Sequence, residues 1–454
     1  MQVRSYPVNF CKTVTCDNFG KTDIAQRGKI SHRLGFPSLH CHQCGGHPPL
    51  VDGEHISVVT NNKLRQALSA TPLACPRCMP LAADKKAATT RYGKTAKGSQ
   101  RYACQQCQHV FSFPSPYLQD KDILLLENVL QRIPVTDAIQ QLKISPKTYY
   151  ASIQRTALRL EAVTRLMESR LELSQARVET HSEVLNAGAE HRLWCLFSQF
   201  IDSNYVLLAS HNVSGAQIDS DHHYISKNDT QVRCDSVIEM KSLLEERYRQ
   251  LLSRYHFEDL NYGPARGYRH AVLIKPADLC YVHFNLLAQQ LNNVRHQVHY
   301  IEHESCLRSG ALSANLGRFR EQSIDICYKV TGGGICNDLS ESGQKVSWWQ
   351  DKWYPMPEGS ISAITPYSER VVKQLGASYR QPTSCFYSYL SAHLPKGLRS
   401  YEQVNALIML HRFFFNYVEV QKDGTTPAMR AGLAVKPWSL STLDETLAEV
   451  IESL

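Results

Sequence analysis

Eight cysteines stand within the first 107 residues as four close pairs, and they limit what this part of the chain can fold into. The other seven cysteines are scattered singly and the total of 15 is odd, which argues against a secreted disulfide scaffold. Two close pairs supply the four thiolates of a tetrahedral zinc site, and small segments with such sites fold around the metal. We therefore predict two structural Zn²⁺ sites in tandem, with these ligands: Cys11, Cys16, Cys41, Cys44, Cys75, Cys78, Cys104 and Cys107.

The first predicted zinc module covers residues 1–55 and combines the spacing Cys11-x4-Cys16 with Cys41-x2-Cys44. Two glycines follow the second pair, and glycine lets backbone N–H groups turn toward the thiolates. His40 and His42 flank that pair and are alternative ligands. For residues 51–70 we expect a short strand and a helical turn.

The second predicted module, residues 70–115, has two pairs with the x2 spacing that lets two thiolates chelate one ion. The segment between the pairs is basic and contains tyrosines, which suits the hairpin of a zinc ribbon whose cations meet DNA phosphates. Its candidate DNA contacts are Arg91, Lys94, Lys97 and Arg101. Zinc ribbons also bind proteins, so a protein partner stays an alternative.

Residues 120–176 show helical periodicity, and we predict a helix-turn-helix followed by a linker helix. Residues 135–142 form the first helix, and the second begins with Ser145 as N-cap and Pro146 at the first helical position. We expect a buried seam of Ala138, Leu142, Ile144 and Ile153. The face left for the DNA major groove carries Lys147, Thr148, Tyr150, Gln154 and Arg155. The linker helix could pair with a second copy of the chain or pack within it.

The charge distribution supports a nucleic-acid partner. Residues 1–178 carry a formal charge of +12, whereas the remainder carries −4. A basic region that also contains zinc modules favours binding to a polyanion, and we predict double-stranded DNA. No stretch approaches the ~18–20 apolar residues of a membrane span, and the N-terminus has no apolar signal core, so we expect no membrane association.

From residue 177 the pattern changes to strands, and we predict a mixed α/β domain over residues 177–437. It has an insertion at about 214–268 and an irregular stretch between residues 331 and 399, and a tail follows at 438–454. Three strands, a helix, a strand, a helix, a strand and a later long helix is the element order of a ribonuclease-H-like domain. In that fold carboxylates from separated segments hold two Mg²⁺ ions, which activate the attacking oxygen and stabilise the leaving one. The candidate carboxylates are Glu179, Glu183, Glu302, Glu304 and Glu402, with Glu302 and Glu304 expected on one strand face.

The motif CPRC…RYACQQC…F, followed by a helix-turn-helix, resembles the front end of IS1-type transposases. The strand order and the closing N-Y-V…DGTTPAMRAGLA are similar to the catalytic domain of DDE transposases and integrases. Together the resemblances cover about residues 70–178 and 179–437, and they leave the first zinc module unaccounted for. They imply DNA cleavage and strand transfer with Mg²⁺, in a bacterial cytoplasmic protein associated with the nucleoid. A homodimer or higher oligomer is the expected assembly.

The carboxylates depart from the family pattern. The first family aspartate usually follows a threonine, but here Thr180 is followed by His181. Glutamates stand where the second and third carboxylates are expected, and the extra methylene shifts a carboxylate in chemistry where ~1 Å of misplacement can cost ~100-fold. Histidine suits softer metals than Mg²⁺. A catalytically inactive, transposase-derived regulator or architectural factor therefore stays the alternative function.

Overall fold

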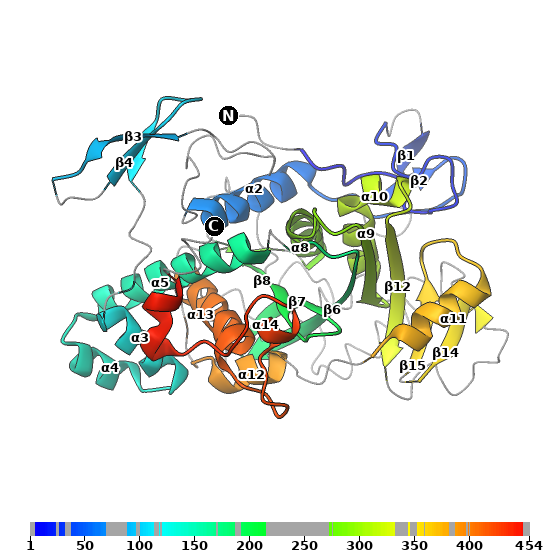
Figure 1. Cartoon of the computed structure of the whole chain (residues 1–454). Helices are drawn as coiled ribbons and strands as arrows, with labels where there is room; N and C mark the ends of the chain where they lie inside the picture. The colour runs from blue at the N-terminus through cyan, green and yellow to red at the C-terminus, as the bar shows by residue number, and fades with distance from the viewer. Residues whose placement is uncertain are drawn as a thin grey trace, which may run out of the picture. The chain divides into compact units, whose positions relative to one another are not determined.

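The computed structural model of the chain is shown in Figure 1. It describes residues 5–23, 27–31, 38–69, 89–96, 100–112, 118, 120–168, 171–186, 192–214, 272–274, 276–331, 344–345, 352–357, 359–380, 386–395, 398 and 400–447. Two compact units result: Met1–Thr60 with Glu172–Tyr387, and Asn61–Leu171 with Ser388–Leu454. The mixed α/β class predicted from the sequence is confirmed. None of the described helices is long and apolar enough to cross a membrane.

An eight-stranded mixed sheet forms the centre of the first unit, with the strand order β13-β14-β15-β12-β11-β6-β7-β8. Neighbouring strands are antiparallel except that β11 runs parallel to both β6 and β12. The strands are β6 (Gln175–Asn186), β7 (Arg192–Phe200), β8 (Val206–His211), β11 (His296–Glu302), β12 (Ile324–Thr331), β13 (Gln344–Lys345), β14 (Lys352–Met356) and β15 (Gly359–Ala363). Short strands β9 (Val213–Ser214) and β10 (Val272–Leu273) pair separately.

Helices on both faces cover this sheet. They are α8 (Pro276–Gln290), α9 (Ser305–Ala314), α10 (Leu316–Arg320) and α11 (Glu369–Ser378), and α12 (Phe386–His393) begins where the first unit ends. Parallel strands need crossover connections, and α8 and α9 supply them before and after β11. On one face His283 of α8 hydrogen-bonds to Ser198 and Ser210 of β7 and β8 at 2.7 and 2.9 Å. On the other face Tyr379, at the end of α11, joins a core that includes Tyr300 of β11.

Two secondary-structure predictions are wrong, one for residues 51–70 and one for residues 331–399. Residues 51–70 form helix α2 (Gly53–Ser69), because Ile56, Val59 and Leu64 recur at helical spacing and are buried. The stretch expected to be irregular contains β13, β14, β15, α11 and α12. The β14–β15 hairpin was not predicted, because it contains Pro355 and Gly359, and both residue types usually interrupt a strand. Before α2 the chain forms a small hairpin, β1 (Gly28–Ser31) and β2 (Ser38–Cys41).

The second unit contains a three-stranded sheet of β3 (Thr89–Lys94), β4 (Gln100–Cys104) and β5 (Val110–Ser112). Its helices are α3 (Asp120–Leu130), α4 (Val135–Leu142), α5 (Pro146–Glu168), α13 (Tyr401–Phe413) with a π-helical turn at Phe414–Val418, and α14 (Pro427–Arg430), and a 3₁₀ turn follows at Leu440–Thr442. The linker helix is the C-terminal half of α5, and it packs within the chain against α13.

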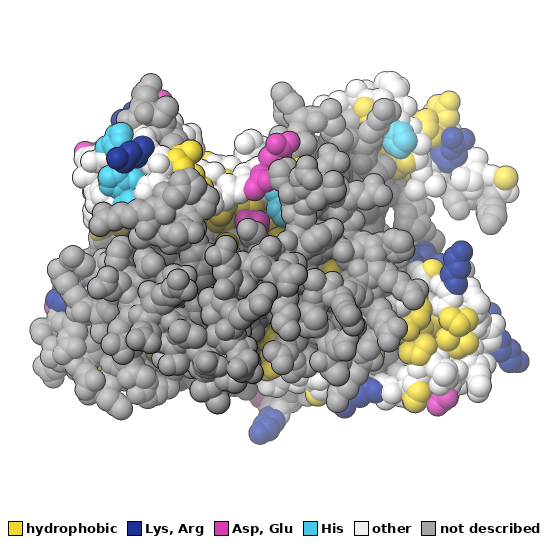
Figure 2. All heavy atoms as spheres, turned by 180° about the vertical axis from the view of Figure 1, so that it is seen from behind, with side chains coloured by type: hydrophobic (Ala, Val, Ile, Leu, Met, Phe, Trp, Pro, Cys, Tyr) yellow, Lys and Arg dark blue, Asp and Glu magenta, His cyan; other side chains and the backbone are white. Residues whose placement is uncertain are grey.

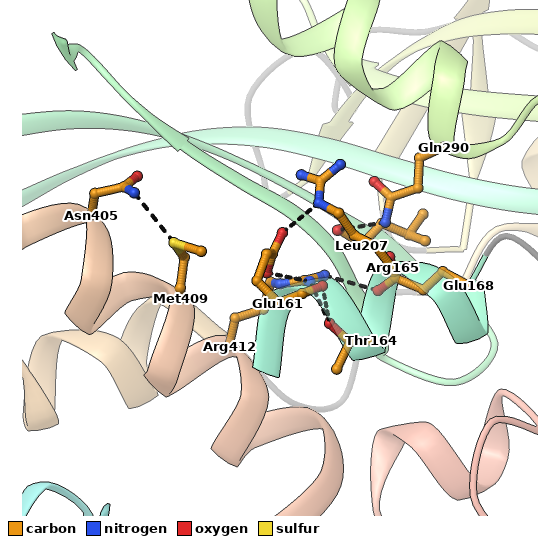
Figure 3. A network of polar contacts seen from close by, with 9 residues as sticks. All are labelled: Glu161, Thr164, Arg165, Glu168, Leu207, Gln290, Asn405, Met409 and Arg412. Carbon is orange, nitrogen blue, oxygen red and sulfur yellow. Dashed lines mark hydrogen bonds and ion pairs between the residues drawn. The ribbon is translucent and has the colours of Figure 1, made fainter. Parts of the chain in front are cut away.

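A buried ionic network joins α5 to α13, as Figure 3 shows. The Arg412 guanidinium of α13 donates to Glu161 at 2.7 Å and to Glu168 at 3.0 Å, both on α5. Arg165 bonds the other Glu161 oxygen at 2.7 Å. The pKa of Glu161 falls to about 2, since these two cations outweigh the burial that would raise it. Removal of one partner from such a network would leave a buried charge uncompensated, which is strongly destabilising.

Candidate functional site

The four cysteines of the first module converge on one point. Their sulfur atoms all lie within 4.8 Å of one another. The Sγ atoms of Cys11 and Cys44 are 3.4 Å apart, and those of Cys16 and Cys41 are 3.9 Å apart. Zn–S bonds of ~2.3 Å in a tetrahedron place sulfurs about 3.8 Å apart. The cluster could therefore bind one zinc ion, as the spacing predicted. His40 and His42 lie outside this ligand group, and His40 stacks on His47 instead.

Hydrogen bonds in the second knuckle favour the thiolate of Cys41. The Cys41 N–H donates to Gly46 O at 2.9 Å and the Gly45 N–H to Cys41 O at 3.0 Å, with Gly45 in the left-handed region at φ 68°. Burial would raise the pKa of Cys41, but hydrogen bonds from the Cys44 backbone and the Asn18 side chain outweigh it and bring the pKa to about 6. Burial raises the pKa of Cys11. Donors aimed at sulfur favour the thiolate, which is the form that binds metal.

The first module is packed into the sheet unit, where Figure 1 shows β1 and β2 beside α10. The Phe19 ring lies 5.1 Å from the Phe319 ring of α10. Arg308 of α9 donates to Lys12 O at 3.3 Å. Arg320 of α10 donates to Gly20 O at 3.5 Å. The loop that carries the first cysteine pair is thus held by the two helices that follow β11.

The Cys104–Cys107 pair forms the same kind of turn in the second unit. The Cys104 N–H donates to His109 O at 3.0 Å, and the Gln108 N–H donates to Cys104 O at 2.8 Å. Gln108 has φ 58°, the position that glycine takes in the first module. Cys75, Cys78 and Lys97 lie outside the described residues, so the second zinc site stays a prediction.

Basic and aromatic side chains lie on the β3–β4 hairpin. Arg91 and Lys94 are exposed, and Arg101 is half-buried. The Arg101 guanidinium lies 5.7 Å from the centroid of Tyr92, a ring that is 58% exposed. Figure 2, a view from behind, shows Lys and Arg side chains on the described surfaces of this hairpin and of α3–α5. A cation beside an exposed ring can meet both a phosphate and a base.

Helix α4 has the predicted bounds and α5 begins at the predicted Pro146, but α5 ends at Glu168 and not at the predicted Ala176. Ala138, Leu142 and Ile153 are buried, and Ile144 is half-buried. The Thr148 N–H donates to the Ser145 hydroxyl at 3.2 Å, which caps α5. The predicted DNA-facing side chains are exposed, with Tyr150 half-buried: Lys147, Thr148, Tyr150, Gln154 and Arg155. Arg155 also pairs with Asp122 of α3 at 3.2 Å, which holds its guanidinium against the helix bundle.

Three of the five candidate carboxylates, Glu179, Glu183 and Glu302, share one face of the large sheet. Glu179 of β6 is opposite Tyr300 of β11, and Glu302 lies two positions further along β11, so alternation puts both glutamates on the same side. Glu179 forms a buried ion pair with Lys329 of β12 and accepts from the Tyr379 hydroxyl at 3.2 Å. Lys329 is opposite Glu302 in the β11–β12 register. The sheet thus brings together two carboxylates and one ammonium.

Glu302 is hydrogen-bonded within the sheet, and burial shifts the pKa of Glu302 and of two nearby residues of β6. Glu302 accepts from the Ser182 N–H at 3.0 Å and from the Ser182 hydroxyl at 2.7 Å. Burial raises the pKa of Glu302, although the Ser182 bonds and Lys329 act in the opposite direction. Burial also raises the pKa of the Glu183 carboxyl. Burial lowers the pKa of His181 to about 4, so its imidazole is neutral at pH 7.

Glu304 does not join the cluster as expected. Strand β11 ends at Glu302, and Glu304 is the residue before α9, where its backbone N–H donates to Glu302 O at 2.7 Å. The prediction that Glu302 and Glu304 share a strand face is therefore wrong, because the chain leaves the sheet between them. Glu402 belongs to the second unit, in the first turn of α13, and accepts from the Ser400 hydroxyl at 2.6 Å.

Two residues of the carboxylate cluster were not predicted from the sequence. Lys329 and Asp325 are the two charged residues in the strand segment IDICYKV, and a buried lysine in a strand usually has a carboxylate partner. That signal was available. Tyr379 gives no such signal, because its contact with Glu179 arises from the packing of α11.

Among the described residues, one group of three or more potential ligands lies close enough together to hold an ion, and it consists of the four cysteines. No described carboxylate belongs to such a group. Comparisons of the chain with protein-family models, with curated proteins and with solved structures found no match.

Proposed function

We propose that this chain is a transposase-like DNA-binding protein that acts as a regulator or architectural factor. The carrying observation is the α3–α4–α5 arrangement, in which a capped second helix exposes Lys147, Thr148 and Gln154. A second helix with this exposed polar face suits insertion into the major groove. The formal charge of +12 on residues 1–178 supports contacts with phosphates.

The large sheet supports the relation to transposases. Its section β8-β7-β6-β11-β12 has three antiparallel strands followed by two strands parallel to β6. This is the arrangement expected of a ribonuclease-H-like domain, with α8 and α9 as its crossovers. In the proposed family relation, β6 and β11 are the strands that carry the first two carboxylates.

The state of those carboxylates favours DNA binding without metal-dependent cleavage. Glu179 is neutralised by Lys329, and Glu302 is bonded to Ser182 on the neighbouring strand. An active strand-transfer enzyme is the competing outcome of the test below.

The test uses the full-length, zinc-loaded protein and a library of random DNA duplexes. We expect selection of a defined sequence, with affinity that falls steeply as salt rises. Replacement of Lys147 and Gln154 by alanine should weaken binding to the selected duplex by about 10-fold or more, since each base-edge contact contributes ~1–3 kcal/mol. Lys422→Ala, at an exposed lysine of the same unit, is the matched control and should leave binding unchanged.

Two results would contradict the proposal. Weak binding that does not respond to salt would remove DNA as the partner and favour a protein ligand. Nicking or joining of the selected duplex in the presence of Mg²⁺ or Mn²⁺, abolished by Glu179→Gln, would restore the enzymatic function.

A further inference from the structure

Lys329 and Glu179 are more deeply buried than charged side chains usually are. Their side chains are 8% and 6% exposed, and the ammonium bonds directly to the Glu179 carboxylate. The second Glu179 oxygen accepts from the Tyr379 hydroxyl at 3.2 Å. Lys329 Nζ also lies 5.6 Å from the centroid of the Tyr379 ring. Both oxygens of Glu179 and one side of the ammonium therefore have protein partners.

The sheet register places the same ammonium beside the second carboxylate. Lys329 is opposite Glu302 on the adjacent strand, and its charge acts to lower the pKa of Glu302. His181 is neutral and adds no charge to this group at pH 7. Two carboxylates thus face one fixed monovalent cation that comes from the chain itself.

We infer that the Lys329 ammonium is the resident cation of this cluster and holds the place that a divalent ion takes in a ribonuclease-H-like site. The inference rests on the proposed relation to that fold and deepens it. The residues present do not fit Mg²⁺, because an added ion would meet the positive charge of Lys329 at a distance where like charges repel strongly. It would also have to displace the hydrogen bonds that Tyr379 and Ser182 give to the two carboxylates.

A variant without the ammonium should bind a divalent ion in its place. Lys329→Met removes the charge and keeps most of the volume of the side chain, which leaves the Glu179 carboxylate buried and uncompensated. A buried charge without its partner is strongly unfavourable, and binding of a cation relieves that cost. Lys329→Met should therefore gain a site for one divalent ion that the natural chain lacks.

The experiment measures Mn²⁺ binding by the full-length, zinc-loaded protein, from the loss of the electron paramagnetic resonance signal of free Mn²⁺. We expect Lys329→Met to bind one additional Mn²⁺ per chain, roughly 100-fold more tightly than the natural protein does at this cluster. Lys329→Arg keeps the charge and should gain no site. The double variant Glu179→Gln/Lys329→Met removes both charges and should also gain none.

The melting temperature with and without Mn²⁺ gives a second readout that holds even if Lys329→Met is poorly folded. Stabilisation of Lys329→Met by Mn²⁺, absent from the double variant, supports the inference. Lack of both binding and stabilisation overturns it, and so does Mn²⁺ binding by the natural chain that Glu179→Gln abolishes. No DNA is used, so failure here is distinct from failure of the DNA selection, which does not depend on Lys329.

Discussion

The Cys41–Cys44 turn and the Cys104–Cys107 turn have the same backbone hydrogen bonds and different surroundings. In each, the first cysteine N–H donates to the carbonyl five residues later, and its carbonyl accepts from the N–H four residues later. The first turn belongs to a module held by α9 and α10, through contacts such as Phe19 with Phe319. The second packs on a small cluster of its own, in which Cys104 lies against Phe111.

This difference shows that the local sequence is enough to form the turn, whereas the elements packed around it decide its role. The first turn stabilises the loop that covers two helices of the sheet unit. The second turn carries a hairpin with exposed Arg91 and Tyr92. We therefore expect loss of the first turn to affect the stability of the sheet unit, and changes on the second hairpin to affect DNA binding.

The largest expected effect comes from removal of the first metal site. Cys41→Ser should lower the stability of residues 305–320 by several kcal/mol, because a structural zinc site contributes up to ~10 kcal/mol or more to folding. Hydrogen exchange of that segment, followed by mass spectrometry, measures the change. Cys104→Ser belongs to the other unit and is the control that should leave exchange there unaltered. If Cys41→Ser and the natural chain show equal protection, the first turn does not contribute to the stability of the sheet unit.

The contact between the first module and α10 gives the next largest effect. Phe19 is half-buried between Phe10 and Phe319, at ring distances of 5.9 and 5.1 Å. Phe19→Ala should cost about 2–3 kcal/mol, below the full range for a buried phenylalanine. The same exchange experiment should report it in α10. Phe111→Ala is the matched change in the second turn, and it should reduce exchange protection in β3–β5 alone. If Phe19→Ala loses protection only in the first 20 residues, Phe19 does not stabilise α10.

A smaller effect is expected on DNA binding, and it concerns the second turn only. Arg91→Ala/Arg101→Ala should weaken the selected duplex by about 10-fold and reduce the salt slope by about 2, since two phosphate contacts are removed. Fluorescence anisotropy at several salt concentrations measures both quantities. Lys29→Ala, at an exposed lysine of β1 in the first module, is the comparison. Equal losses from both variants would mean that the two modules share the DNA contacts.

The smallest effect tests the turns themselves. Gly45 and Gln108 both have positive φ, 68° and 58°, but only glycine adopts this conformation without strain. A Cβ on Gly45 would meet no atom within 4 Å, so Gly45→Ala should cost only the backbone strain, about 1 kcal/mol or ~5-fold in zinc affinity. Gln108→Gly should gain up to about 1 kcal/mol. Competition with a chelator measures both, and shifts of the same sign would show that the turns are not equivalent.

Much of the fold could be predicted because its signals are local. The bounds of α4 and the start of α5 match the sequence prediction, where Ser145 and Pro146 mark the helix start. The strands from β6 to β12 follow apolar runs with turn residues between them. The β14–β15 hairpin was missed because Pro355 lies within it, opposite Ser360 on β15. A proline is acceptable at such a position when its missing N–H is not needed by the ladder.

The sequence by itself predicted the four-cysteine cluster that could bind one zinc ion, since the spacing of Cys41 and Cys44 suffices for a chelating turn whatever surrounds it. Only the tertiary structure decided the state of the carboxylates. Glu179 and Lys329 are 150 positions apart, and Arg412 and Glu161 are 251 positions apart. Such pairs depend on the register of β6, β11 and β12 and on the packing of α5 against α13, which no local pattern encodes. Spacing can therefore identify a metal turn, whereas the partner of a buried charge is set by the fold.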